Sequence, residues 1–473
     1  MVWACRVDKS GLCLVAMKKP NIILINCDDL GYGDLGCYGS PVNKTPALDR
    51  LAAEGVRFTD FYMAAPVCSP SRGAMMTGCY PRRIGFGSFE DRWVLFPGQP
   101  VGLSPDEITM ARLLKDQGYA TMHVGKWHCG DQPEFMPVRH GFDRYYGLPY
   151  SNDMGVQKGR EDYPPLPLID GEEVIQEQPD QASLTERYVE QCVRFMRENR
   201  DGSFFLYFGH MYVHLPLYAP ERFMEQSENG VYGAAVECID WATGVLMDEL
   251  RELGLDENTL VMFTSDNGSN ARNGASNLPL RGTKGTTWEG GMRVPFIARW
   301  PGKIQPGTTC GELATSMDLL PTLTHLAGGE VPTDRIIDGK DIATLVLGED
   351  GAQSPHEAFF YYFTDALEAV RYGRWKLYVN RHGKGRKPEP VCELYDLAAD
   401  VGETTNVAEA NPEVVKELTV RVEKCREDLG DSATGAEGAN CRPVGRVENP
   451  DTLTHQDPDH PYIVAMYDMR HTD

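Results

Sequence analysis

The sequence predicts an α/β fold with a mostly parallel sheet, followed by a smaller antiparallel sheet with one packed helix. Two observations lead to this prediction. Short apolar, β-branched runs alternate with helical patterns, and after about residue 355 the chain becomes aromatic and rich in β-formers. The length of 473 residues suits one large domain and one smaller one.

The strands expected in the large sheet are short and apolar. The first, residues 20–27 (PNIILINC), ends directly on Asp28-Asp29, as a buried strand of a parallel sheet would. The others are residues 119–125 (YATMHVG), 203–209 (SFFLYFG), 259–264 (TLVMFT) and 294–300 (VPFIARW).

Several expected helices are marked by residues that favour helix ends. Thr45-Pro46 places proline at a first helical position, and Gly55 follows the end of that helix. Residues 104–107 (SPDE) have the form of a capping box, for a helix that ends at Gly118. Residues 234–253 carry apolar side chains at helical spacing, which predicts a helix packed on the core.

We expect four parts along the chain. Residues 1–16 show no element and are interpreted as an N-terminal extension, and residues 17–354 as the large domain. Residues 355–440 form the predicted C-terminal subdomain, in which a helix opens at Asn411-Pro412. Residues 441–473, rich in Pro, Asp and His without periodicity, predict an extended tail or wrapping arm.

Composition argues against several classes of partner. A net charge of −23 opposes non-specific binding to nucleic acid or to anionic membranes, so neither is expected as a partner. The thirteen cysteines have no CxxC pair and no zinc-like spacing, which favours thiols in a reducing compartment. The start of the chain carries Asp8 and Lys9 where a signal peptide would be apolar, and no apolar run is long enough to span a membrane. A cytoplasmic location is therefore predicted.

Two polar pairs follow predicted strands, where ligands bind in open α/β sheets. Asp28-Asp29 follows the first strand, and Asp266-Asn267 follows the strand at 259–264. Alone, each pair is more often a turn or a helix cap. Together they offer four oxygen ligands, which suit a hard cation such as Ca²⁺ or Mg²⁺.

Residues 68–72 (CSPSR) place a cysteine at a predicted helix start. Ser69-Pro70 is typical of an N-cap and first turn, so Cys68 is expected just before the helix, near N–H groups and a dipole that favour anions. Arg72 adds a fixed positive charge. Without these neighbours, a lone cysteine would be interpreted as a small buried hydrophobe.

The form Cys-x-Pro-Ser-Arg resembles the modification signature of the type I sulfatases of the alkaline phosphatase superfamily. The surrounding motifs occur in the order found in that family, over residues 20–400: NIILINCDDLGYGDLGCYG, TPALDRLAAEGVRF, CSPSRGAMMTG, GKWHCG, SDNG and KGTTWEGGMRVP. The segments YPRRIGF, FMPVRHGFDRYYGLPYS and AVRYGRWKLYV resemble the group that contains arylsulfatase A and N-acetylgalactosamine-6-sulfatase.

This resemblance implies a large mixed, mostly parallel sheet sandwiched by helices, and a sulfatase mechanism. Cys68 would become Cα-formylglycine, whose hydrated gem-diol attacks sulfur and then releases sulfate by re-forming the aldehyde. The calcium ligands implied are the modified residue 68 together with Asp28, Asp29, Asp266 and Asn267. A formylglycine-generating or anaerobic sulfatase-maturing enzyme is implied as a partner.

The resemblance also assigns roles around the nucleophile. Arg72 would hold the formylglycine hydroxyl, and Lys126 and Lys284 would bind the sulfate group. His128 in GKWHCG would contact the gem-diol and drive sulfate elimination. His214 in MYVHLP would lie near the leaving oxygen and, with Lys284, is a candidate general acid. Ser151 in GLPYSND matches a further active-site serine.

Three positions depart from the family pattern. Asn152 stands where histidine is frequent, which leaves the substrate side open. Cys129 replaces a common leucine, interpreted as a packing change, and Cys79 replaces a common arginine, which alters charge behind the site.

Two alternatives to a sulfatase remain at this point. The first is a hydrolase of phosphate or phosphonate esters from the same superfamily, and the second is a non-catalytic relative that binds sulfated glycans. One metal site and two lysines favour the singly charged sulfate ester. Terminal sulfated sugars of the galactose or N-acetylgalactosamine type are the expected substrates, with simple aryl sulfates as surrogates.

Overall fold

The computed structural model describes residues 19–382, 387–457 and 459, and its centre is a ten-stranded sheet. The strand order is β12 (Thr308–Cys310), β2 (Val56–Phe58), β11 (Phe296–Arg299), β10 (Thr259–Ser265), β1 (Asn21–Cys27), β9 (Phe204–Gly209), β5 (Ala120–Gly125), β6 (Arg144–Gly147), β7 (Pro167–Asp170) and β8 (Glu173–Glu177). The run from β10 to β6 is parallel, whereas β11 and β7 oppose both of their neighbours. The predicted mixed, mostly parallel sheet is confirmed.

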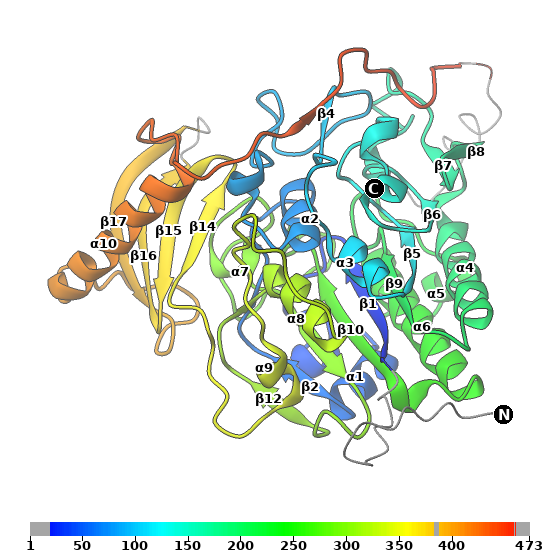
Figure 1. Ribbon diagram of the computed structural model, residues 1–473, viewed down its shortest axis with the longest axis horizontal. Helices are drawn as coiled ribbons and strands as arrows, with labels where there is room; N and C mark the ends of the chain where they lie inside the picture. Colours follow the sequence, from blue (N-terminus) through cyan, green and yellow to red (C-terminus); the bar gives the residue numbers. More distant parts are fainter. Residues whose placement is uncertain (1–18, 383–386, 458, 460–473) are drawn as a thin grey trace, which may run out of the picture.

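Helices cover both faces of this sheet (Figure 1). One core contains side chains of α1 (Pro46–Ala53), α4 (Leu184–Glu198), α5 (Glu221–Met224) and α6 (Gly230–Glu252). The other contains side chains of α2 (Cys68–Thr77), α3 (Met110–Asp116), α8 (Leu319–Leu326) and α9 (Ala343–Leu347). In β1, Ile23 and Ile25 enter the first core while Ile22 and Leu24 enter the second, which explains why the middle of the strand is apolar on both faces.

The predicted capping box at residues 104–107 is wrong. The helix begins later, at Met110, and Thr109 caps it by accepting a hydrogen bond from the Arg112 N–H at 3.2 Å. Ser104 instead closes a turn, because its carbonyl accepts from the Glu107 N–H at 2.9 Å. The sequence around Ser104 therefore specifies a turn that precedes the helix.

The smaller sheet is an antiparallel meander with one helix packed against it, as predicted. Its strands are β14 (Phe359–Phe363), β15 (Ala366–Tyr372), β16 (Trp375–His382) and β17 (Pro388–Asp396), and its helix is α10 (Pro412–Leu429). Figure 1 shows this unit beside the large sheet. The boundaries proposed for the four parts of the chain stay predictions, and residues 1–16 lie outside the described residues.

The segment after α10 runs back across the large domain (Figure 1, red). Arg442 forms an ion pair with Glu107 at 2.7 Å, and β18 (Gly445–Arg446) pairs with β4 (Val101–Gly102). The remaining short elements are β3 (Phe61–Tyr62), β13 (Ala314–Thr315) and α7 (Glu289–Met292). The described cysteines are all free thiols, and no helix in the described residues has the length and apolar character needed to cross a bilayer.

A buried ionic group joins the smaller sheet to the large domain. The Lys376 ammonium on β16 lies 2.9 Å from a carboxylate oxygen of Glu289 and 2.9 Å from one of Glu403, and all three side chains are fully buried. Lys376 also donates to the Thr287 carbonyl at 2.8 Å. Within the described residues, removing this cation would leave the buried Glu403 without an ion pair and Glu289 with only Arg293, at 3.4 Å.

We predict that Lys376→Ala lowers the free energy of unfolding by about 3–5 kcal/mol, because a buried charge cluster loses its cation. The matched control is Arg374→Ala, which removes an exposed ion pair with Asp396 and should change the free energy of unfolding far less, because solvent screens exposed pairs. Urea unfolding of both variants measures the difference. Equal losses in the two variants would contradict the role assigned to Lys376.

Candidate active site

The carboxyl ends of five adjacent parallel strands supply the predicted site residues. Asp28 and Asp29 follow β1, and Asp266 follows β10, which is paired with β1 up to Cys27 and Ser265. Likewise Lys126 follows β5, Ser151 lies beyond β6 and His214 lies beyond β9. The fold therefore brings these side chains together at the edge of the sheet where ligands bind in open α/β folds.

The two acidic pairs contact each other directly. The Asp29 N–H donates to Asp266 Oδ1 at 3.2 Å, and Asn267 Nδ2 donates to Asp29 Oδ1 at 2.7 Å. All four side chains of the pairs are buried. Residues 237 and 238 positions apart in the chain thus form one cluster of oxygen atoms, as the sequence predicted.

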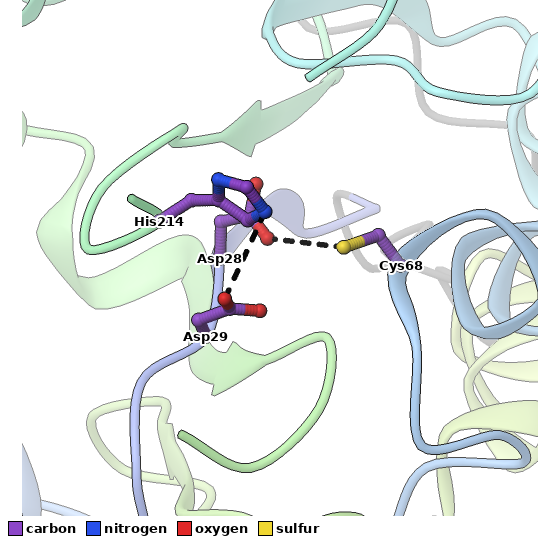
Figure 2. A group of neighbouring side chains, drawn as sticks. All are labelled: Asp28, Asp29, Cys68 and His214. Atoms are coloured by element: carbon purple, nitrogen blue, oxygen red, sulfur yellow. Dashed lines mark hydrogen bonds and ion pairs between the residues drawn. The ribbon is translucent and has the colours of Figure 1, made fainter. Parts of the chain in front are cut away.

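Cys68 faces this cluster from the first turn of α2 (Figure 2). Its Sγ lies 3.4 Å from Asp28 Oδ1, and one ligand atom each of Asp28, Asp29, Cys68 and His214 lies within 4.8 Å of the others. The prediction that Ser69 caps the helix is wrong. Helix α2 starts at Cys68, and Ser69 Oγ accepts a hydrogen bond from the Leu95 N–H at 3.1 Å.

Three cations neutralise the three carboxylates. The Lys126 ammonium donates to Asp28, Lys284 Nζ lies 2.7 Å from Asp29 Oδ1, and Arg72 Nε lies 2.8 Å from Asp266 Oδ2. Lys284 also reaches Cys68 Sγ at 3.3 Å. Arg72 is held further by the Lys126 carbonyl, which accepts from Nη1 at 2.8 Å.

These surroundings set the protonation of the cluster. Burial and the Asp28 charge raise the pKa of the Cys68 thiol. Burial would raise the pKa of Asp28 as well, but Lys126 and His214 outweigh it and hold that pKa well below its usual range. Burial and Asp28 raise the pKa of Asp266 to about 7. Cys68 therefore stays a neutral thiol near pH 7, and an unmodified thiol is a poor nucleophile in that form.

His214 and Ser151 are a further pair of contacting side chains in the site. His214 Nε2 lies 3.8 Å from Asp29 Oδ2, and both ring nitrogens lie 3.4 Å from Ser151 Oγ. Ser151 Oγ in turn accepts from Lys126 Nζ at 3.3 Å. Burial and the charge of Lys284 lower the pKa of His214, so its ring is neutral at neutral pH.

His128 is buried beside the charged cluster, and its role stays a prediction. Its Nε2 lies 3.0 Å from the Leu95 carbonyl, and its Nδ1 has no hydrogen-bond partner in the described part of the chain. The backbone of Leu95 thus contacts two side chains of the site: its N–H donates to Ser69 Oγ, and its carbonyl lies beside His128 Nε2. Sequence reasoning missed this segment because backbone contacts from an irregular loop leave no residue signature.

Asp153 is a second residue that sequence reasoning missed. Burial opposes its charge, but His214 and Arg160 lower its pKa, and Arg160 Nη1 lies 2.7 Å from its Oδ2. The sequence signal for Asp153 is its position two residues after Ser151 in GLPYSND.

The donor set fits a hard divalent cation. Asp28, Asp29 and Asp266 offer carboxylate oxygens, and Asn267 Oδ1 is a buried acceptor without a donor among the described residues. Oxygen ligands of this kind suit Ca²⁺ or Mg²⁺ better than zinc. The charges of the three carboxylates are balanced by those of Arg72, Lys126 and Lys284. A bound divalent cation would therefore give the site a net positive charge, which suits an anionic substrate.

Comparisons with known proteins agree with this arrangement. Residues 20–329 match the sequence family described as Sulfatase, and residues 283–428 match the C-terminal family of N-sulphoglucosamine sulphohydrolase. Arylsulfatase A of Homo sapiens is 41% identical over 451 residues, which cover 86% of this chain and 87% of that protein. N-acetylgalactosamine-6-sulfatase of Canis lupus familiaris is 42% identical over 379 residues, covering 76% and 72%.

A solved structure is similar over nearly the whole chain. The crystal structure of Ps i-CgsB in complex with k-i-k-neocarrahexaose superposes with a TM-score of 0.76 at 30% sequence identity, covering 91% of this chain and 96% of that one. The similarity thus extends through the large sheet and the smaller one.

Proposed function

The chain belongs to the sulfatase family and is a sulfuric ester hydrolase, and on that premise we propose a formylglycine nucleophile, a calcium ion and a terminal sulfated sugar as substrate. The observation that carries the proposal is the convergence of Cys68, Asp28, Asp29 and Lys284 at one end of the sheet. Each component is supported by a different property of the site.

The nucleophile is proposed to be Cα-formylglycine made from Cys68. The unmodified thiol is protonated in this environment, which disfavours direct attack by sulfur. The hydrated aldehyde would supply an oxygen nucleophile and a second hydroxyl, so that sulfate can leave as the aldehyde re-forms. Cys68 is 1% exposed, so a formylglycine-generating or anaerobic sulfatase-maturing enzyme must reach it before folding is complete.

The metal is proposed to be Ca²⁺, held by residue 68 with Asp28, Asp29, Asp266 and Asn267. A bound calcium ion polarises the sulfuryl oxygens and lowers the pKa of the nucleophile. The clustered carboxylates support such a site, because Asp266 would be ionised more readily beside a divalent cation than beside Asp28 alone.

The remaining residues are proposed to bind and orient the sulfate ester. Lys126 and Lys284 flank the cluster and would stabilise charge on the transferring group. Asp29 more than offsets the cost of burying Lys284 and raises its pKa, so Lys284 carries the proton at neutral pH and would donate it to the leaving oxygen. The neutral His214, beside Ser151, would orient that oxygen.

Arg72 and His128 are proposed to act on residue 68 after modification. The Arg72 guanidinium has one buried nitrogen, Nη2, without a hydrogen-bond acceptor among the described residues, which leaves a donor for an added hydroxyl. His128 has an unpaired Nδ1 and would drive sulfate elimination from the modified residue.

Terminal sulfated sugars of the galactose or N-acetylgalactosamine type are proposed as substrates. The N-acetylgalactosamine-6-sulfatase relative and the similar structure with a bound neocarrahexaose support a carbohydrate ester. The acidic chain, at −23, disfavours long polyanions away from the site. A cytoplasmic location is supported by the free thiols, and there the enzyme would act on small oligosaccharides.

We predict that peptide mass spectra of enzyme co-expressed with a maturing enzyme show an aldehyde at residue 68. Cys68→Ala should abolish turnover of a chromogenic aryl sulfate and keep the unfolding curve close to wild type, because the change is small and removes the nucleophile. The control is Cys129→Ala, another buried cysteine with no proposed step. Full activity in Cys68→Ala would refute the mechanism.

We predict that Asp29→Asn lowers aryl sulfate turnover by at least about a thousandfold and removes bound calcium, since the site loses several kcal/mol of charge stabilisation. Asp240→Asn is the control, because Asp240 is a mostly buried carboxylate that caps α1, with Oδ1 accepting the Leu48 N–H at 2.8 Å. Elemental analysis and kinetics measure both effects. Zinc, or two metals per chain, would contradict the calcium assignment.

We predict the highest kcat/KM on galactose or N-acetylgalactosamine 6-sulfate, because a pocket that strips water from sulfate must hold one sugar in one pose. The comparison set is the matching 4-sulfates, intact sulfated polymer, and an aryl sulfate beside the same aryl phosphate. A preference for polymer would refute the chain-end substrate. Faster hydrolysis of the phosphate would instead favour the phosphoesterase alternative.

A further inference from the structure

A cavity of about 390 Å³ lies between the large domain and the C-terminal subdomain, away from the active site. Its lining includes Tyr80, Ile336 and Lys340 of the large domain, and Phe360 and Lys424 of the subdomain. Cavities of roughly 300–1,000 Å³ are typical of small-ligand sites. The volume therefore suffices for a ligand of one or two sugar units.

Helix α2 separates this cavity from the nucleophile. Cys68 is its first residue, and Tyr80 lies three residues beyond its last, Thr77. A helix of 10 residues is about 15 Å long. A ligand in the cavity would thus not contact the cluster around Cys68.

Two of the cationic side chains that line the cavity have no carboxylate partner in the described part of the chain. Lys340 and Lys424 are exposed, and neither has an ion pair within the described residues. The two arginines of the lining are already paired, Arg421 with Glu357 at 2.9 Å and Arg83 with Asp338 and Asp428 at 2.7 and 2.6 Å. The Arg421 Nε is buried without a hydrogen-bond acceptor in the described part of the chain.

This local charge runs against the charge of the whole chain. With a net charge of −23, the surface as a whole repels anions. Uncompensated lysines around a concave surface focus the opposite potential there. An anionic group is the chemistry that these side chains would recognise.

Part of the lining is apolar. Ile336 is 43% exposed, and Phe360 is half-buried, with its N–H donating to the Tyr80 hydroxyl at 3.1 Å. The Tyr80 and Phe360 rings lie with their centroids 6.2 Å apart. An apolar wall facing cationic side chains suits a sugar, whose C–H face packs on such a wall while its anionic substituent meets the ammonium groups.

We propose that this cavity is a second, non-catalytic site that binds a small sulfated saccharide. The sulfate group meets Lys340 and Lys424, and the sugar packs on Ile336 and Phe360. The choice of a sulfated sugar rests on the proposed function, whereas the site itself rests on the cavity and its charges. Such a site would retain a sulfated oligosaccharide near the enzyme between turnovers.

The test uses methyl NMR of Ile-labelled Cys68→Ala protein, in which turnover cannot consume the ligand. Galactose 6-sulfate is expected to shift the methyl signals of Ile336 and Ile337 saturably, while neutral galactose at the same concentration leaves them in place. The double variant Lys340→Ala/Lys424→Ala should weaken this binding by about tenfold or more, the effect of losing one or two charge-assisted contacts. The readout is independent of catalysis, so it stands whether or not the enzyme hydrolyses this sugar.

Lys416→Ala is the matched control, because Lys416 is an exposed lysine of the same helix, α10, outside the cavity lining. Lys416→Ala should leave the binding unchanged. In protein that keeps Cys68, the double variant should hydrolyse an aryl sulfate at the wild-type rate. The proposal is overturned if neither methyl signal responds, if the double variant binds as well as its parent, or if inorganic sulfate alone reproduces the shifts.

Discussion

The burial of three carboxylates at one edge of the sheet constrains the rest of the active site. Asp28, Asp29 and Asp266 are adjacent because β1 and β10 pair in parallel and end at the same level. Buried ions cost several kcal/mol each unless they are paired. Their partners Lys126, Lys284 and Arg72 come from three other segments, so those segments must be placed correctly for the cluster to be stable.

That constraint also bears on the modification proposed for Cys68. Asp28, one of the proposed metal ligands, lies 3.4 Å from the Cys68 sulfur. Burial and the Asp28 charge together raise the pKa of the thiol and disfavour a thiolate. Lys284, at 3.3 Å from the sulfur, and Lys126 favour the thiolate, but burial and the Asp28 charge outweigh them and keep the thiol protonated. The surroundings of Cys68 are therefore better matched to an uncharged oxygen nucleophile than to sulfur.

Much of this could be predicted from the sequence, and the failures have physical causes. The apolar run before Asp28 and the run before Asp266 identified two strands whose ends must meet, because parallel neighbours end at one edge. The starts of two helices were misplaced, since Ser104 and Ser69 favour helix caps locally but bond elsewhere in the fold. The contact of His128 with Leu95, and the cavity beside Lys424, depend on tertiary packing that no local pattern encodes.

The C-terminal subdomain helps to position the active site, because it contacts the segment that follows Lys284. At the start of that segment, the Lys284 N–H donates to the Ser269 carbonyl and the Gly285 N–H donates to the Pro66 carbonyl, both at 2.9 Å. Lys376 of the smaller sheet then binds the Thr287 carbonyl and, through Glu289, the helix that follows. A catalytic lysine must be placed within a fraction of an ångström, and loops alone do so poorly. The buried ionic contacts from the smaller sheet supply that rigidity, so the two sheets form one functional unit even though all the proposed catalytic side chains come from the larger one.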